Sequence, residues 1–339
     1  MNYAGVRSVL DADAVSAVEV RDLRKNYGQI EAVRGVSFTV EDGEIFALLG
    51  PNGAGKTTTL EILEGFRRRD AGDVRVLGHD PGDRSAGRVL REQIGLVLQD
   101  IAVEPYLTVR ETVARNAGYY PNPRGIDEVI ELVDLSGQEK QKVKALSGGQ
   151  KRRLDLALGM VGNPRLLFLD EPTTGFDPNA RRGAWQIVAN LRSAGTTIVL
   201  TTHYMDEAQV LADRVAVIAA GQIVAAGTPA TIGGRDLAMT RIRFTLPADV
   251  AAAELPVTGG VVTDGADGAT VTFDAEEPTA VLHRLTGWAI ERGTTLPGLT
   301  VERPSLEDIY LKLTGSPGDE HEEPPAKPRR RGLLARSGR

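Results

Sequence analysis

Three short groups of residues carry side chains that could bind a polyphosphate and hydrolyse it. The first group, Gly50 to Thr57, reads GPNGAGKT and fits the pattern G-x-x-x-x-G-K-[S/T]. It lies between an apolar run and a helix-like stretch, so main-chain N–H groups could turn inward around phosphates at a helix start. Lys56 would reach the β- and γ-phosphates, and the Thr57 hydroxyl would bind Mg²⁺. The segment predicts a phosphate-binding loop, with a chance glycine turn as the alternative.

The second group is a pair of carboxylates, Asp170 and Glu171, which follow the apolar run 166–169. The apolar run predicts a buried central strand whose carboxyl end emerges where the phosphates lie. Asp170 would hold Mg²⁺ through water, and Glu171 would polarise the attacking water as a general base. The alternative is a strand end with two solvated acids, and the phosphate loop upstream argues against it.

The third group, Leu146 to Gln150, reads LSGGQ. Gly148 and Gly149 follow Ser147 at the start of a predicted helix, where free N–H groups could form a second anion site. One nucleotide does not need two phosphate sites from one chain, so this site would serve a nucleotide held by another copy. Alternatively, Ser147 is simply a helix N-cap with a flexible entry. The residues alone leave both interpretations open.

Strands that alternate with helices must position these groups. Apolar residues two apart at Val36, Phe38 and Val40 indicate a half-buried strand, and 45–49 is apolar throughout, as in a buried strand. This alternation predicts a mostly parallel sheet covered on both faces, interrupted by a helical insert. Further strands are expected at 74–78, 94–98, 166–170, 196–203 and 214–227, and helices at 57–66, 108–120, 126–135 and 149–161.

The composition changes near residues 227–236, which suggests a domain boundary. We expect a loose leader at 1–16, the main domain at 17–230 and a small α+β domain at 236–314. In that small domain, strand patterns recur near 241–246, 269–273 and 299–303, and helix patterns near 279–293 and 305–315. Ser305 and Asp308 have the spacing of a capping box. The tail, 315–339, is acidic, then Pro-rich, then basic. It is expected to be disordered and solvated, with contact to anionic lipid as the alternative.

The composition excludes several classes of function. The 339 residues carry a net charge of −6 and no cysteine, which rules out disulfides, iron–sulfur clusters, zinc fingers and thiol nucleophiles. No apolar stretch approaches the roughly 18 residues of a membrane span, and the start of the chain does not read as a signal peptide. The mild acidity argues against free binding to nucleic acid, so no nucleic-acid partner is expected.

Together, the three groups resemble the nucleotide-binding subunit of ATP-binding-cassette (ABC) transporters over about residues 17–230. Gly50–Thr57 matches the Walker A motif, Leu166–Glu171 matches Walker B with its catalytic glutamate, and Leu146–Gln150 matches the family signature. The resemblance implies an α/β fold of the P-loop NTPase (ABC ATPase) class. That fold has an antiparallel β subdomain and a helical insert at about 106–161, here followed by the small C-terminal α+β domain.

Single residues extend the resemblance. Gln99 resembles the Q-loop glutamine, Asp177 the D-loop aspartate of the dimer interface, His203 the switch histidine, and Tyr27 the aromatic residue that stacks on adenine. The alternatives are a polar loop residue for Gln99, a structural residue at a strand end for His203 and a half-buried strand residue for Tyr27; the position of His203 argues against its alternative. The residues implied to bind the nucleotide are Tyr27, Gly50, Pro51, Asn52, Gly53, Ala54, Gly55, Lys56, Thr57, Thr58, Ser147, Gly148, Gly149, Gln150 and Asp177. Thr57, Gln99 and Asp170 are implied for Mg²⁺, and Glu171, His203 and Gln99 for catalysis.

The stretch 146–182 and the C-terminal SLEDIYLKLTG resemble more narrowly the daunorubicin-resistance type of ATP-binding subunit. This resemblance implies ATP and Mg²⁺ as ligands, a second copy or a paralogous subunit as dimer partner, and a separate ABC-2 type permease for drug or other export. It places the chain peripherally at the cytoplasmic face of the cell membrane. The alternatives are a soluble ABC ATPase of translation or DNA repair and a regulatory module that holds ATP without turnover. The single cassette, the lack of cysteine and the lack of long heptad inserts disfavour the soluble ATPase. The intact Gln99, Glu171 and His203 disfavour the regulatory module.

Overall fold

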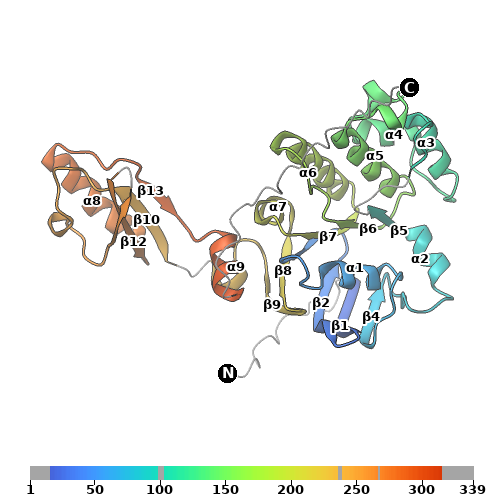
Figure 1. Ribbon diagram of the computed structural model, residues 1–339, viewed down its shortest axis with the longest axis horizontal. Coiled ribbons are helices and arrows are strands. Elements are labelled where there is room, and N and C mark those ends of the chain that lie inside the picture. Colours follow the sequence, from blue (N-terminus) through green and yellow to red (C-terminus); the bar gives the residue numbers. More distant parts are fainter. Residues whose placement is uncertain (1–15, 98–102, 236–238, 266–267, 315–339) are drawn as a thin grey trace, which may run out of the picture.

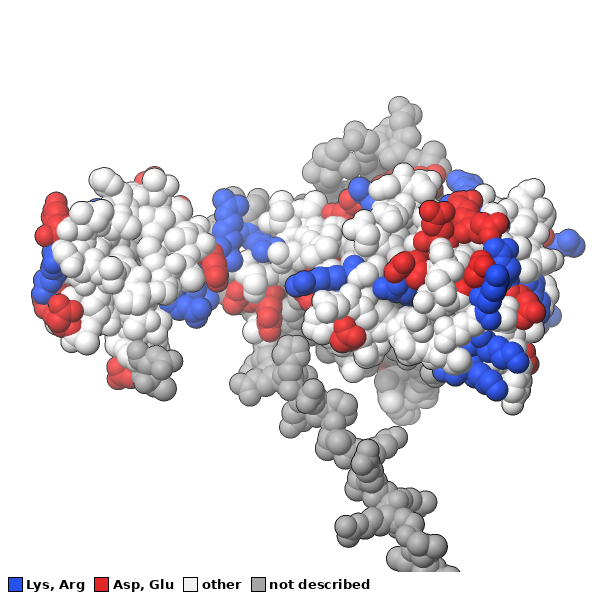
Figure 2. Space-filling view, turned by 90° about the horizontal axis from the view of Figure 1, so that it is seen from above, with Lys and Arg blue, Asp and Glu red and all other residues white. Residues whose placement is uncertain are grey.

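The computed structural model describes residues 16–97, 103–235, 239–265 and 268–314. These residues form a large lobe and a smaller C-terminal lobe, with helix α9 (Leu306–Thr314) where the two meet (Figure 1). On the face shown in Figure 2, acidic and basic side chains are interspersed over the large lobe, and most of the smaller lobe is uncharged. Within the described part of the chain, no helix is both long and apolar enough to cross a bilayer.

A six-stranded sheet forms the centre of the large lobe, in the order β5-β6-β7-β3-β8-β9. All neighbours run parallel except the last pair, β8 and β9, which is antiparallel. The mostly parallel sheet predicted from the sequence is therefore confirmed. Its strands are β3 (Ile45–Leu49), β5 (Ile94–Val97), β6 (Leu166–Asp170), β7 (Thr197–Thr202), β8 (Arg214–Ala219) and β9 (Gln222–Gly227).

Helices cover one face of this sheet. Ile45, Ala47 and Leu49 of β3 point into a core that they share with the helices. Because successive side chains of a strand face opposite ways, the apolar residues of β3 pack into two cores, one on each face of the sheet. The helices on this side, which include the helical insert, are α3 (Val109–Ala117), α4 (Ile126–Leu132), η1 (Ser136–Gln138), η2 (Val143–Ala145), α5 (Gly148–Met160), α6 (Pro178–Ser193) and α7 (Met205–Leu211).

The opposite face supports a second core, to which β3 contributes Phe46 and Leu48. This core is closed by helix α1 and by a three-stranded antiparallel sheet in the order β2-β1-β4. Val36 and Val40 are fully buried there and Phe38 nearly so, as their spacing predicts. The elements on this side are β1 (Ser16–Tyr27), β2 (Ile30–Glu41), α1 (Lys56–Leu63), β4 (Ala71–Val76) and α2 (Gly87–Gln93).

The smaller lobe has its own core beneath a four-stranded antiparallel sheet, in the order β11-β12-β10-β13. Ile242 and Phe244 of β10 pack there with Phe273 of β12 and Leu285 of α8. Its elements, with the short helix that precedes them, are η3 (Ile232–Gly234), β10 (Thr240–Thr245), η4 (Ala252–Glu254), β11 (Val261–Gly265), β12 (Gly268–Ala275), α8 (Pro278–Arg292) and β13 (Thr300–Glu302).

Helix α9 returns to the large lobe. Its N-terminus carries the expected capping box, since Asp308 N donates to Ser305 Oγ at 3.0 Å and Ser305 N to Asp308 Oδ2 at 2.8 Å. Leu306 is buried in the same core as the helical face of the central sheet, and α9 lies against α7, β9 and η3. Arg235 holds the approach to this helix by donating to Pro304 O at 2.7 Å. The core of the smaller lobe thus lies within 240–302, while α9 packs outside it.

Candidate active site

The phosphate loop follows directly from the buried strand β3. A Cβ at Gly50 would lie 2.3 Å from the carbonyl oxygen of Ile218, so only glycine fits where the loop leaves the sheet. Gly55 caps the start of α1 with φ +103°, and a Cβ there would lie 2.4 Å from the carbonyl oxygen of Ala32. Both glycines are therefore required by the close approach of other main chain. This geometry agrees with a loop whose main chain can surround phosphates.

Lys56 is the first residue of α1, and its side chain is 4% exposed. Its Nζ donates to the carbonyl oxygens of Gly50 at 2.8 Å and Pro51 at 3.1 Å, and lies 3.4 Å from Glu171 Oε1. Burial lowers the pKa of Lys56, and the charge of Glu171 opposes that shift. The ammonium group is thus held over the loop by acceptors that phosphate oxygens could replace.

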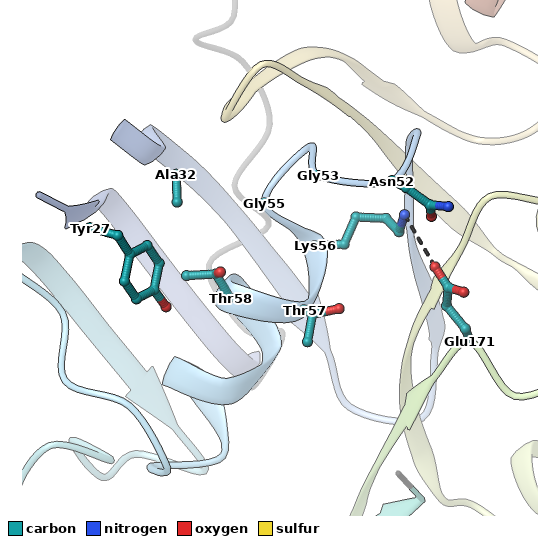
Figure 3. A pocket seen from close by; sticks show the side chains of 9 residues that line it. All are labelled: Tyr27, Ala32, Asn52, Gly53, Gly55, Lys56, Thr57, Thr58 and Glu171. Atoms are coloured by element: carbon teal, nitrogen blue, oxygen red, sulfur yellow. Dashed lines mark ion pairs between the residues drawn. The ribbon is translucent and has the colours of Figure 1, made fainter. Parts of the chain in front are cut away.

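A pocket of about 350 Å³ opens over the loop. Its lining residues are Tyr27, Ala32, Asn52, Gly53, Gly55, Lys56, Thr57, Thr58 and Glu171. Figure 3 shows the Tyr27 ring at one end, the Lys56–Glu171 pair at the other, and Thr58 between them. The guanidinium of Arg67 lies 5.1 Å from the centre of the Tyr27 ring. The pocket therefore has a flat aromatic end and a polar end, as a nucleoside polyphosphate requires.

Glu171 is held at the polar end by several neighbours. The Thr174 hydroxyl donates to its Oε2 at 3.1 Å, and His203 Nδ1 lies 3.3 Å from the same oxygen. The contact with His203, followed by the charge of Lys56, lowers the pKa of Glu171 from 4.5 to about 2, although burial opposes this shift. The carboxylate is therefore ionised at neutral pH, as a general base must be.

Asp170 and Thr57 lie together beside this carboxylate. The Thr57 hydroxyl donates to Asp170 Oδ1 at 3.4 Å, and the Thr201 hydroxyl donates to the same oxygen. Among the described residues, no group of three or more His, Cys, Asp or Glu side chains could hold a metal by itself. One hydroxyl and one carboxylate beside a phosphate loop fit Mg²⁺, which takes its remaining ligands from phosphates and water.

The signature residues lie elsewhere. Ser147 caps α5: Gln150 N donates to Ser147 Oγ at 3.2 Å, and Ser147 N donates to Gln150 Oε1 at 2.9 Å. Ser147, Gly148, Gly149 and Gln150 are absent from the pocket lining, as is Asp177, which caps α6. The N-cap interpretation is thus confirmed, and a role towards another copy stays a prediction. Gln99 lies outside the described residues.

Some contributors could not be found by spacing. Thr201 binds Asp170 through its hydroxyl and also accepts a hydrogen bond from Glu171 N at 3.1 Å. It looks like any β-branched residue of a buried strand. Ala32 gives no signal either, since it reaches the pocket from β2 only because the fold brings separate segments together. Thr174 lies three residues after Glu171, but its residue type alone does not indicate that its hydroxyl binds that carboxylate.

The chain matches the family model "ABC transporter" over residues 33–174 and the model "ABC transporter domain-containing protein-like, C-terminal domain" over residues 240–305. Nod factor export ATP-binding protein I of Burkholderia orbicola (strain AU 1054) is 37% identical over 309 residues, covering 89% of this chain and 98% of the relative. Daunorubicin resistance ATP-binding protein DrrA3 of Streptomyces coeruleorubidus is 38% identical over 89% of this chain and 97% of its own length. Linearmycin resistance ATP-binding protein LnrL of Bacillus subtilis (strain 168) is 33% identical over 88% and 98%.

Solved structures share the fold of the large lobe. CbiO1 of Clostridium perfringens, part of the ABC transporter complex cbiONQ, matches 63% of this chain and 89% of its own with a TM-score of 0.59 at 28% identity. The dimeric ATP-binding cassette MJ0796 bound to ADP and Pi matches 62% of this chain and 98% of its own with a TM-score of 0.56 at 24% identity. With relatives this similar over nearly its whole length, the chain belongs to the ATP-binding subunits of ABC transporters, a family of ATPases.

Proposed function

We propose that this chain hydrolyses ATP to drive an exporter, working as a pair of subunits with a separate ABC-2 type permease at the cytoplasmic face of the membrane. One observation supports the proposal: Tyr27, the phosphate loop and Glu171 line one pocket, whereas the signature segment lies outside it. The signature segment could form a second anion site, and the nucleotide pocket of the same chain does not use it. Such a site is suited to a nucleotide held by the partner subunit.

Within each site, the Tyr27 ring would stack on the base and the loop would surround the phosphates. Mg²⁺, held by Thr57 and Asp170, would neutralise charge on the phosphate oxygens. Lys56 and His203 both contact the Glu171 carboxylate. A γ-phosphate would compete for both partners and leave Glu171 free to orient and deprotonate the attacking water.

The signature segment would close the site from the other subunit. Ser147 and the N–H groups that follow it would contact the γ-phosphate, so ATP would join the two subunits. Hydrolysis would remove that contact and let the pair open, a nucleotide-controlled switch between two states. The permease would convert opening and closing into movement of its substrate.

Export is supported by the relatives, whose names refer to Nod factor export and to resistance to daunorubicin and linearmycin. The substrate would be chosen by the membrane partner. Co-purification tests this part of the proposal. Detergent-solubilised membranes should yield a stoichiometric multi-span protein with the tagged chain, whereas ribosomes or only soluble partners would contradict it.

The pairing is tested by size-exclusion chromatography of Glu171→Gln with ATP and Mg²⁺. The variant should bind ATP, stall hydrolysis and elute as a dimer. The same variant with Ser147→Arg should bind ATP and elute as a monomer. If Glu171→Gln stays monomeric at saturating ATP, the shared site is wrong.

A further inference from the structure

Arg152 lies on α5 and reaches the main chain that carries the catalytic glutamate. Its guanidinium is buried, with the residue 9% exposed. Nε donates to Pro172 O at 2.9 Å, while Nη2 donates to Asp170 O at 3.2 Å and to Glu171 O at 3.3 Å. Nη1 donates to Asp155 Oδ2 at 3.2 Å. One rigid, always charged donor group thus binds three successive carbonyl oxygens.

The segment that Arg152 holds has an unusual conformation. Glu171 has φ +45°, in the left-handed region that non-glycine residues adopt only when their surroundings hold them there. Its N–H donates to the carbonyl oxygen of Thr201 at 3.2 Å, which fixes one side of the residue. Arg152 fixes the other side by binding the carbonyl groups at and around Glu171. The direction of the Glu171 side chain therefore depends on both.

The same helix begins at the signature. Ser147 caps α5, and Arg152 follows five residues later, about 7.5 Å along the helix axis. We propose that Arg152 is a positioning residue that ties the orientation of Glu171 to the position of the signature helix in the same chain. The positioning role concerns one chain, and only its wider consequence depends on the proposed pairing. In a pair, the signature of one chain serves the partner's nucleotide, so Arg152 would link the two ATP sites.

Asp155 offers a way to separate positioning from folding. It is 9% exposed, and burial raises its pKa to about 7 although the charge of Arg152 opposes the shift. Loss of Arg152 alone would leave this carboxyl group buried without its ion-pair partner, which destabilises a protein. Replacing both residues by apolar side chains of similar size removes that effect, because buried ion pairs often give way to apolar pairs at little loss.

The first experiment compares Arg152→Met with Arg153→Met in the full chain. Arg153 is the next residue of α5, but it faces Asp134, to whose Oδ2 it donates at 2.5 Å. Arg152→Met should keep its affinity for a fluorescent ATP analogue within about twofold and lose on the order of tenfold to a hundredfold in kcat, as expected of a displaced catalytic group. Arg153→Met should keep both. An unchanged kcat in Arg152→Met would overturn the proposal.

The double variant Arg152→Met with Asp155→Leu keeps the test valid if the single variant folds poorly. It should regain the part of the Tm that Arg152→Met loses through the unpaired Asp155, while kcat stays low because the three carbonyl groups still lack their donor. Recovery of both Tm and kcat would mean that Arg152 is merely structural, and the proposal would be wrong.

Mixed dimers test which of the two ATP sites Arg152 serves. In a pair with Ser147→Arg in one chain, the site that still works uses Glu171 of that same chain. Arg152→Met in this chain should lower the remaining turnover by the same factor as in the single variant, and in the other chain it should have no effect. Equal loss from both placements would mean that Arg152 supports the signature rather than Glu171. If Ser147→Arg leaves turnover unchanged, the shared site fails, and the comparison of Arg152→Met with Arg153→Met still decides the positioning role.

Discussion

Glu171→Gln should raise the affinity of the isolated subunit for ATP while it stops hydrolysis. Lys56 Nζ and His203 Nδ1 lie 3.4 Å and 3.3 Å from the Glu171 carboxylate, so an incoming phosphate must draw both away from it. A glutamine at this position has no charge with which to hold them. The variant therefore removes two things at once: the carboxylate charge that competes with the phosphate for Lys56 and His203, and the general base.

The size of the effect follows from the carboxylate's own pKa. Its neighbours lower the pKa of Glu171 from 4.5 to about 2, a difference of about 2.5 that corresponds to roughly 3 kcal/mol. Solvent in the open pocket screens these contacts, and the phosphate replaces only some of them. We therefore expect on the order of 1 kcal/mol, or about fivefold tighter ATP binding. Loss of the general base should lower kcat by about 10² to 10⁴.

The assay is equilibrium binding of a fluorescent ATP analogue at a protein concentration too low for dimers, alongside steady-state phosphate release. Glu128→Gln is the matched control, since Glu128 is a carboxylate on the same lobe that pairs with Arg124 and does not line the pocket. It should change neither quantity. Weaker binding by Glu171→Gln would refute the competition argument, and wild-type turnover would refute the general-base assignment.

Four further outcomes are expected. Lys56→Ala should weaken nucleotide binding and abolish phosphate release, because it removes the buried cation over the loop. Gly50→Ala should lower the Tm and the ATP affinity, because its Cβ would meet the Ile218 carbonyl oxygen at 2.3 Å. Leu306→Ala should lower the free energy of unfolding by about 2–5 kcal/mol in urea titrations, because Leu306 is 1% exposed in the core of the large lobe. The stabilisation from the lowered pKa of Glu171 is present above pH 4.5 and lost as the pH falls towards 2. Acid titration of Glu171→Gln should therefore lack that component of the decline.

Much of the large lobe was predictable because its signals are local. The apolar strand 45–49, the glycine loop and the helix after it adjoin one another in the chain, so their spacing alone predicts the phosphate site. The strand β11 (Val261–Gly265) was missed, because it is a short edge strand whose Val261 is 64% exposed. Without a buried face, such a strand leaves no clear alternation in the sequence.

The place of α9 was not predictable for a different reason. Its capping box is local and was found, but the surface it covers is formed by α7, β9 and η3, at least 70 residues earlier in the chain. The spacing of apolar residues in a helix indicates which face of the helix is buried, but it does not indicate which core that face packs against. Leu306 could have joined the core of the smaller lobe, and only the folded chain shows that it joins the larger one.

Arg152 and Arg153, close to the proposed catalytic centre, could not be distinguished from the sequence either. They are adjacent and identical in type, so composition and motif spacing cannot separate them. Successive residues of a helix point about 100° apart, which sends Arg152 under the end of β6 and Arg153 towards Asp134. The sequence therefore predicts the groups that would contact the phosphates, because these groups lie in motifs of fixed spacing in loops and at strand ends. The groups that hold those residues in place come from other faces of the fold, and a buried arginine beside a motif is recognised only by the carbonyl groups it binds.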